Sequence, residues 1–258
     1  MIKAIFFDID GTLVSFESHR MSDRLKECLD KLRAIGVKLF ISSGRHVLMM
    51  NNLDNYPFDG YIAMNGALTI FGGEVIDQQP LSKDLALRVA QIATERNTPC
   101  WSFAEGICGI NLENEKSIEV SKELNFFPDE YLDLFEVARS RPVYQYTIYM
   151  SKEEEDKYLR PVLKGVDYPR WHPYFADIVP EGLSKSYGAS LILDRLGLTP
   201  AECMAFGDGG NDIPIIEYAG IGVAMGNATP DVKAAADYVT GSVDEDGVIS
   251  ALRHFGVL

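Results

Sequence analysis

Close to the start of the chain lies Ala4-Ile5-Phe6-Phe7-Asp8-Ile9-Asp10-Gly11-Thr12, a short apolar run that leads directly into acidic residues and a glycine. Such a run, bounded by turn-forming residues, is typical of a strand buried on both faces. A helix is predicted next, because Ser22 can cap it, apolar residues recur at helical spacing as far as Ile35, and Gly36 ends it. Residues 37–41 form a second apolar run. Strand, helix and strand within about forty residues indicate a right-handed βαβ unit with parallel strands.

The pattern along the rest of the chain changes twice. Further strands are predicted at residues 59–63, 67–71 and 74–76, and then the chain becomes a mixture of helices, hairpins and an acidic stretch until about Pro180. From Ser184 the alternation of strands and helices resumes. We therefore predict an α/β protein with a doubly wound, Rossmann-like parallel-sheet core, formed by residues 1–81 and 181–258. Residues 82–180 are predicted to form an inserted α+β domain.

Composition and charge limit the classes of partner. The chain has 258 residues, 47% hydrophobic and 24% charged, which is ordinary for a globular protein. Its 24 Lys and Arg against 38 Asp and Glu give a net charge of −14, so neither nucleic acid nor an anionic membrane surface is an expected partner. Four cysteines without a Cys-x-x-Cys pair predict no structural zinc. We expect a cytoplasmic protein, because free thiols fit a reducing compartment and the first residues do not resemble a secretory signal. The expected assembly is a monomer or a small homo-oligomer.

Polar residues gather where the predicted strands end. In open parallel sheets, ligands bind at the carboxyl ends of the strands. Any one of these clusters alone is compatible with ordinary turn or cap chemistry. Their recurrence at successive strand ends, on one edge of the sheet, favours a binding site. The clusters are Asp8 to Thr12, Ser42 to Arg45, Asn65-Gly66 and Gly207 to Asp212, with Lys185 at the start of a later helix.

These residue types suit phosphoryl transfer to or from a small phosphorylated metabolite. Asp8 and Asp208 are carboxylates that can hold Mg²⁺, a hard cation that prefers oxygen ligands and cancels the repulsion between a carboxylate nucleophile and a phosphate dianion. If the chain turns after Ile9, Asp8 and Asp10 can face one ligand, one attacking and the other moving a proton. The phosphoryl oxygens would be held by the Ser43 hydroxyl, the Lys185 ammonium and the backbone amides of Gly11 and Gly44.

The ordered set of motifs resembles that of phosphatases of the haloacid dehalogenase (HAD) superfamily, Cof-type subfamily. The four motifs of that superfamily correspond, in order, to Asp8-x-Asp10-Gly11-Thr12-Leu13, Ser43-Gly44-Arg45, Lys185 and Gly207-Asp208-x-x-Asn211-Asp212. Cof-type members carry a large α/β cap between the second and third motifs, where the chain changes character. The resemblance therefore covers nearly the whole chain and implies that the insertion sets substrate specificity.

The resemblance implies the roles of three carboxylates. Asp8 is the expected nucleophile and forms an aspartyl-phosphate. Asp10 is the expected acid and base, which protonates the leaving alkoxide and then deprotonates the hydrolytic water. Mg²⁺ is expected at the Asp8 carboxylate, the Asp10 backbone carbonyl and Asp208. Because superfamily members that serve ion pumps or attack carbon lack a carboxylate at the position of Asp10, its presence favours phosphatase or phosphomutase chemistry.

The remaining motif residues are expected around the phosphate. Ser43, Gly44, Lys185 and Asn211 are implied to bind it, and Ser43 keeps the hydroxyl of the threonine that the subfamily more often has. Asp212 is expected to support the metal site or to orient Lys185.

The resemblance says less about three further residues. Asn65-Gly66 resembles a subfamily feature beneath the cap and is expected to contact the substrate or the cap. Arg45 has two possible partners, the polar end of the substrate and the cap.

The predicted function is a Mg²⁺-dependent phosphatase of small phosphomonoesters, by resemblance sugar phosphates such as hexose phosphates. A phosphosugar mutase is the alternative, followed by a non-catalytic phosphosugar-binding regulator. The insertion is rich in aromatic residues, which we expect to form the core of a small sheet rather than a sugar-stacking surface. These residues are Trp101, Phe103, Tyr144, Tyr146, Tyr149, Trp171, His172 and Tyr174.

Overall fold

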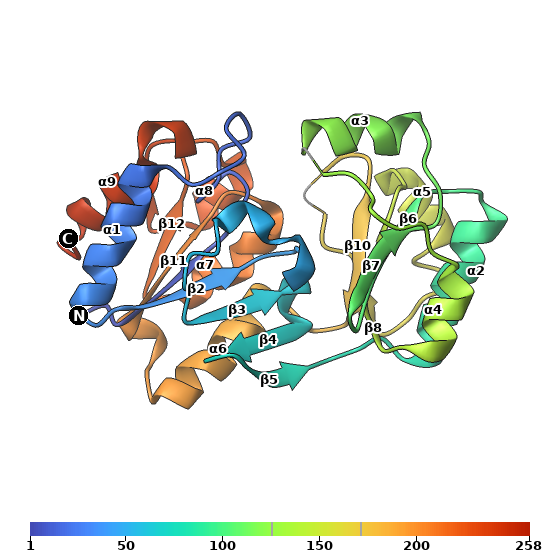
Figure 1. Ribbon diagram of the computed structural model, residues 1–258, viewed down its shortest axis with the longest axis horizontal. Helices are drawn as coiled ribbons and strands as arrows, with labels where there is room; N and C mark the ends of the chain where they lie inside the picture. Colours follow the sequence, from blue (N-terminus) through green and yellow to red (C-terminus); the bar gives the residue numbers. More distant parts are fainter. Residues whose placement is uncertain (125, 171) are drawn as a thin grey trace. The chain divides into compact units, whose positions relative to one another are not determined.

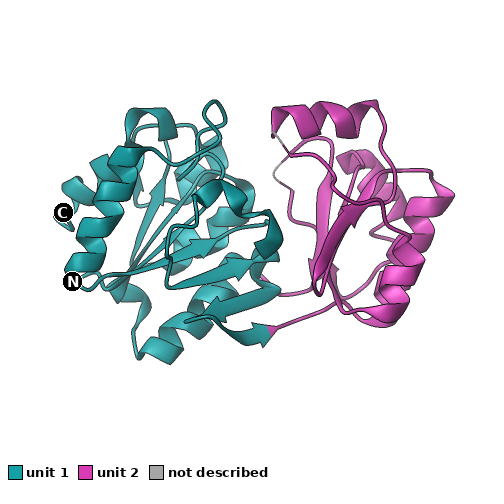
Figure 2. Cartoon of the chain, in the orientation of Figure 1, with its two compact units in different colours: residues 1–77, 184–258 teal, residues 78–183 magenta. Residues whose placement is uncertain are grey.

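The computed structural model describes residues 1–124, 126–170 and 172–258, so Trp171 lies outside the described residues. The chain forms two compact units (Figure 2). The core unit consists of Met1–Asp77 and Ser184–Leu258, and the inserted unit is Gln78–Leu183. The insertion thus begins at Gln78 and ends at Leu183, where the sequence pattern suggested residues 82 and 180. The predicted fold class, a doubly wound core with an inserted α+β domain, is confirmed.

The core unit is built on an eight-stranded sheet with the order β13-β12-β11-β1-β2-β3-β4-β5 (Figure 1). All pairs from β13 to β3 are parallel, whereas β4 runs antiparallel to β3. The strand order reverses between β1 and β11, which is where α/β sheets bind ligands. The strands are β1 (Ala4–Phe7), β2 (Lys38–Ser42), β3 (Gly60–Ala63), β4 (Leu68–Phe71), β5 (Glu74–Gln78), β11 (Cys203–Gly207), β12 (Ile221–Ala224) and β13 (Tyr238–Val239).

Helices cover this sheet. The helices α6, α7 and α8 pack on β3, β4, β11 and β12, whereas α1 packs on β2 and on α9. Phe6 and Phe40 stack with ring centroids 5.1 Å apart, in a buried cluster with Ile192 of α6. Each such buried ring contributes about 1.5–3 kcal/mol to the stability of the fold. The helices are α1 (Asp23–Ala34), α6 (Lys185–Leu196), α7 (Ile213–Tyr218), α8 (Pro230–Ala235) and α9 (Gly247–His254).

The inserted unit contains a second sheet, with the order β7-β6-β8-β10-β9. Its α2 and α4 pack together and against β8 and β6, with Tyr146 and Ile148 in their shared core. The elements are β6 (Cys100–Ala104), β7 (Ile107–Ile110), β8 (Val143–Ile148), β9 (Val166–Asp167), β10 (Ala176–Pro180), α2 (Lys83–Glu95), α3 (Glu115–Glu123), α4 (Leu134–Ser140) and α5 (Lys152–Tyr158). Within the described residues, no helix is both long and apolar enough for a membrane span.

Of the aromatic residues of the inserted unit named above, those in the described part of the chain are buried except Tyr174, which is half-buried. Every residue of β8 is buried, Gln145 and Thr147 included. β8 is an inner strand of its sheet, between β6 and β10. Thr147 Oγ1 meets its hydrogen-bonding need by donating to Asp177 Oδ1 on β10 at 2.5 Å.

Candidate active site

The predicted site residues follow parallel strands of the core unit and therefore lie at one edge of its sheet. Asp8 comes directly after β1, Ser43 after β2 and Asp208 after β11. After Asp8 the chain turns sharply, because the amides of Leu13 and Val14 donate to the Ile9 carbonyl at 3.0 and 2.8 Å. This turn keeps the residues after Asp8 at the sheet edge instead of continuing the strand.

Lys185 joins two of the carboxylates. It is the first residue of α6 and has no exposed surface. Its Nζ donates to Asp8 Oδ1 at 2.6 Å and to Asp212 Oδ1 at 2.5 Å. Burial lowers the pKa of Lys185, but the two carboxylates outweigh burial and raise its pKa above the ordinary value. Lys185 is therefore held as a cation between two acidic side chains.

Asp212 also fixes the loop after β11. Its Oδ2 accepts hydrogen bonds from the backbone amides of Asp208 and Gly209, both at 3.0 Å. With Oδ1 bonded to Lys185, both oxygens of this buried carboxylate have protein partners. The sequence left two roles open for Asp212. Its bond to Lys185 fits the orienting role, and its bonds to the loop of Asp208 fit support of the carboxylate cluster.

Ligand oxygens of Asp8, Asp208 and Asp212 all lie within 4.8 Å of one another. Burial, followed by the charges of Asp212 and Asp10 and opposed by Lys185, raises the pKa of Asp8 to about 7. Burial and the charge of Asp8 raise the pKa of Asp208 to about 9. The carboxylates of this cluster carry more negative charge than the single positive charge of Lys185 can balance. A divalent cation bound among them would reduce their mutual repulsion. A compact set of carboxylate oxygens fits such a metal ion.

Three loops meet beside this cluster. Asn211 Nδ2 donates to Asn65 Oδ1 at 2.9 Å, and the Asn65 amide donates to the Ser43 carbonyl at 3.1 Å. A Cβ atom added at Gly44 would lie 3.4 Å from the Asn65 side chain and 3.5 Å from that of Asn211. Gly44, Asn65 and Asn211 are therefore neighbours, although they come from separate loops.

Gly66 has a structural contact in the core unit. Its φ is +99°, and a Cβ there would lie 2.3 Å from the carbonyl oxygen of Ser184. Ser184 is the N-cap of α6, and its Oγ accepts a hydrogen bond from the Tyr187 amide at 3.2 Å. Only glycine allows this approach, which places the turn after β3 against the segment that carries Lys185.

Arg45 pairs with the predicted acid and base. Its Nε and Nη2 donate to Asp10 Oδ2 and Oδ1 at 2.6 and 2.8 Å, and its Nη1 donates to the Met49 carbonyl at 2.9 Å. The sequence left two partners open for Arg45, the substrate and the cap. In the structure the guanidinium binds Asp10.

One residue of this edge was missed by the sequence reasoning. Asn227 follows β12, and its Nδ2 donates to the Gly11 carbonyl at 2.9 Å and to Asp208 Oδ2 at 3.0 Å. The same reasoning could have found it, because Gly226-Asn227 is another pair of turn-forming residues just after a strand, β12, which ends at Ala224.

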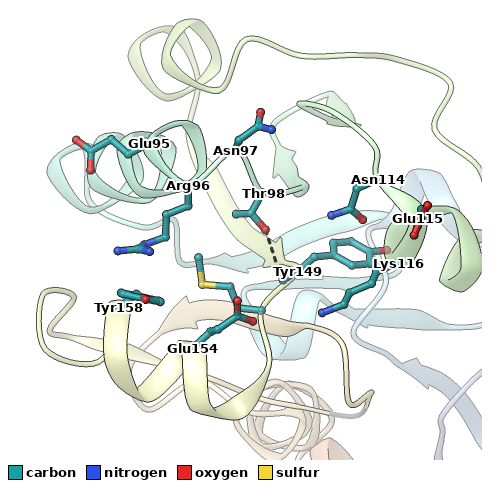
Figure 3. Close-up of a pocket in the computed structure, with 11 residues that line it drawn as sticks. Glu95, Arg96, Asn97, Thr98, Asn114, Glu115, Lys116, Tyr149, Glu154 and Tyr158 are labelled. Carbon is teal, nitrogen blue, oxygen red and sulfur yellow. Dashed lines mark hydrogen bonds between the residues drawn. The ribbon is translucent and has the colours of Figure 1, made fainter.

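The inserted unit has a hollow of its own, of about 820 Å³, shown in Figure 3. The end of α2 and the first turns of α3 and α5 line it. Its wall carries both cations and carboxylates. A hydrogen bond from the Ser151 amide, assisted by the charges of Lys116 and Arg96, lowers the pKa of Glu154. This hollow contains none of the predicted catalytic residues.

A doubly wound fold with carboxylates and a buried lysine at the switch point defines a class of phosphoryl-transfer hydrolases. The family model for haloacid dehalogenase-like hydrolases matches residues 5–252. The chain therefore belongs to the haloacid dehalogenase-like hydrolase family, of the Cof type that the motifs resembled, and it is a phosphoric monoester hydrolase.

Individual relatives agree with this assignment. The chain is 33% identical to the putative phosphatase YkrA of Bacillus subtilis, over 99% of this chain and 98% of the relative. It is 26% identical to the 5-amino-6-(5-phospho-D-ribitylamino)uracil phosphatase YcsE of the same organism, over 98% and 96%. Among solved structures, the HAD subclass IIB sugar phosphatase BT4131 is 40% identical, with a TM-score of 0.92 over 99% of this chain and 100% of that one.

Proposed function

We propose that the chain is a Mg²⁺-dependent phosphatase that hydrolyses small sugar phosphates through an aspartyl-phosphate on Asp8. The observation that carries the proposal is the contact of Asp8 with Lys185, next to the carboxylate of Asp208. Lys185 keeps one oxygen of Asp8 bonded to a buried ammonium, which also offers a positive charge to the incoming phosphoryl group.

Mg²⁺ would be held by the carboxylates of Asp8 and Asp208 and by the backbone carbonyl of Asp10. When bound, it supplies positive charge that neutralises the phosphate dianion and the carboxylate that attacks it. These ligands support Mg²⁺ as the metal ion, because Mg²⁺ prefers oxygen ligands, is usually bound by one or two carboxylates and keeps several water molecules. Asp212 is not needed as a direct ligand, since Lys185 and two backbone amides already engage both of its oxygens.

In the first half-reaction a carboxylate oxygen of Asp8 attacks phosphorus, the bond to the leaving alkoxide breaks, and Asp10 donates a proton to that alkoxide. In the second, Asp10 accepts a proton from the water that attacks the aspartyl-phosphate, and Asp8 is released with inorganic phosphate. Ser43, Gly44 and Asn211 hold phosphoryl oxygens during both steps. Arg45 keeps the Asp10 carboxylate in one orientation.

Sugar phosphates are the proposed substrate class because the subclass IIB relative of 40% identity is described as a sugar phosphatase. The relative of 26% identity acts on a phosphorylated ribitylaminouracil, which is also a phosphate ester of a sugar-derived chain. We assign the choice among such esters to the inserted unit as the cap of the enzyme.

The test measures inorganic phosphate released from a panel of sugar, nucleotide and pyridoxal phosphates, with and without Mg²⁺, by the wild type and by Asp8→Asn. We expect release that requires Mg²⁺, that is fastest with sugar phosphates, and that Asp8→Asn abolishes. The variant should fold, because Lys185 retains Asp212 as its partner. Release that persists in Asp8→Asn would remove the nucleophile assignment. Isomerisation of a sugar phosphate without net release would instead favour the mutase.

A further inference from the structure

Asn227 connects three segments of the core unit through one side chain. Its Nδ2 donates to the carbonyl of Gly11, in the loop after β1, and to Asp208 Oδ2, in the loop after β11. Its Oδ1 accepts a hydrogen bond at 3.0 Å from the amide of Val243, near the C-terminal end of the chain. Both N–H donors of the Asn227 side chain thus bind groups of the predicted catalytic edge, and its oxygen binds the backbone of Val243.

The bond from Val243 decides which way this amide faces. The Val243 amide can only donate, so the oxygen of Asn227 must face it and the NH₂ group must face the two acceptors. An amide turned the other way would bring its oxygen against the carbonyl oxygen of Gly11, which has no proton to donate. Val243 therefore orients the donors of Asn227 toward Gly11 and Asp208.

The backbone around Asn227 is also fixed. Lys233 Nζ donates to the Gly226 carbonyl at 2.6 Å, and the Gly226 amide donates to the Gly241 carbonyl at 2.9 Å. On the other side, the Ala228 amide donates to the Met225 carbonyl at 3.0 Å. A turn held at both ends presents the Asn227 side chain in one place.

The loop after β1 packs directly on the carboxylate that Asn227 binds. Gly11 has a φ of +81°, and a Cβ atom there would lie 2.2 Å from Asp208 Oδ2 and 3.0 Å from Asn227 Nδ2. Asp208 is thus close to the loop that carries Asp8 and Asp10, without any side chain between them. A neutral donor at this position can hold the Asp208 carboxylate against its acidic neighbours, Asp8 and Asp212, without neutralising it.

We propose that Asn227 is a positioning residue for the divalent metal site, which orients Asp208 and joins it to the loop after β1, and that Val243 sets the orientation of Asn227. This inference rests on the proposed metal-dependent function. Partners of ligating carboxylates typically change metal affinity by about 10–100-fold when they are removed. Asn227 is exposed at the surface, so its replacement by alanine creates no buried cavity.

The experiment measures Mn²⁺ binding to the metal-free full chain by electron paramagnetic resonance, which reports the free ion and needs no turnover. Asn227→Ala removes the donor, and Val243→Pro removes only the N–H that orients it. Val243 is the first residue of a short 3₁₀ helix (Val243–Glu245), where proline is tolerated, and the chain itself has Pro200 at the same place after a similar cap. Asn51→Ala, another exposed asparagine of the core unit, is the matched control.

We expect the Kd for Mn²⁺ to rise about tenfold in Asn227→Ala, less in Val243→Pro, and not at all in Asn51→Ala. The midpoint of thermal unfolding in EDTA should be the same for all four proteins. An unchanged Kd for Mn²⁺ in Asn227→Ala would overturn the positioning role. A raised Kd in a variant that also unfolds at a lower temperature in EDTA would overturn it as well, because the loss would then come from a less stable fold. An unchanged Kd in Val243→Pro would overturn the role of Val243. If the wild type itself binds no Mn²⁺, the proposed metal-dependent function fails, and this inference fails with it.

Discussion

Arg45 binds Asp10 through two parallel hydrogen bonds, from Nε to Oδ2 at 2.6 Å and from Nη2 to Oδ1 at 2.8 Å. This bidentate geometry fixes the plane of the Asp10 carboxylate, and the bond from Nη1 to the Met49 carbonyl fixes the guanidinium in turn. The Asp10 carboxylate is thus held in one orientation.

Replacement of Arg45 should therefore act on turnover more than on substrate binding. Lysine keeps the charge but cannot form both bonds, so we expect Arg45→Lys to lower kcat about tenfold and Arg45→Ala about a hundredfold, within the usual range for acid and base catalysis. Steady-state kinetics with a sugar phosphate at saturating Mg²⁺ separate kcat from KM. A raised KM with an unchanged kcat would show instead that Arg45 binds the polar end of the substrate.

Lys185 should be essential for stability as well as for activity. Lys185→Met leaves Asp8 and Asp212 buried without their shared cation, and we expect a loss of about 3–5 kcal/mol in the free energy of unfolding. Urea unfolding at neutral pH in EDTA measures it. The control is Lys26→Met, which removes an ion pair with Asp54 at the surface and should cost about 1 kcal/mol or less. Similar losses in the two variants would contradict the role of burial.

Gly66 should not tolerate a side chain. A Cβ there would lie 2.3 Å from the Ser184 carbonyl, so Gly66→Ala must displace the start of α6 and with it Lys185. We expect a loss on the order of 3 kcal/mol together with reduced turnover. Gly72→Ala is the control, because Gly72 also has a positive φ of +61° but no atom within 4 Å of the added Cβ. That variant should lose about 1 kcal/mol and keep its turnover, as urea unfolding and phosphate release can show.

Metal binding should couple the stability of the protein to pH. Burial raises the pKa of Asp8 to about 7 and that of Asp208 to about 9, from an ordinary value of 3.8. Between about pH 4 and about pH 9, Asp8 and Asp208 together bind more protons in the folded, metal-free chain than in the unfolded chain. Their contribution to the free energy of unfolding therefore falls as pH rises through this window.

A divalent cation takes the place of those protons, so the stabilisation by Mg²⁺ should be larger at about pH 8.5 than at about pH 5.5. Scanning calorimetry with Mg²⁺ or EDTA at the two pH values measures the difference. Asp208→Asn should weaken this dependence, which separates the site from the other acidic groups of the chain. An equal effect of Mg²⁺ at both pH values in the wild type would contradict the prediction.

Local signals predicted the elements of the fold closely. β1 covers residues 4–7 as expected, and α1 begins after Ser22, whose Oγ accepts a hydrogen bond from the Leu25 amide. Both depend on interactions within a few residues, namely an apolar run that stops at Asp8 and a cap that binds its own first turn. The bounds of the insertion, at Gln78 and Leu183, carry no such local signal, because they depend on which unit each residue packs against.

The order of residues along the chain is enough to predict that acidic, amide and hydroxyl side chains gather at one edge of the sheet, because they follow successive parallel strands. Which of these side chains contact one another depends on the tertiary packing. Lys185 contacts Asp8 across 177 positions of the chain, Arg45 contacts Asp10 across 35, and Asn227 contacts Gly11 across 216. Such pairs depend on the packing of α6 and of the loops on the sheet, and spacing along the chain does not encode that packing.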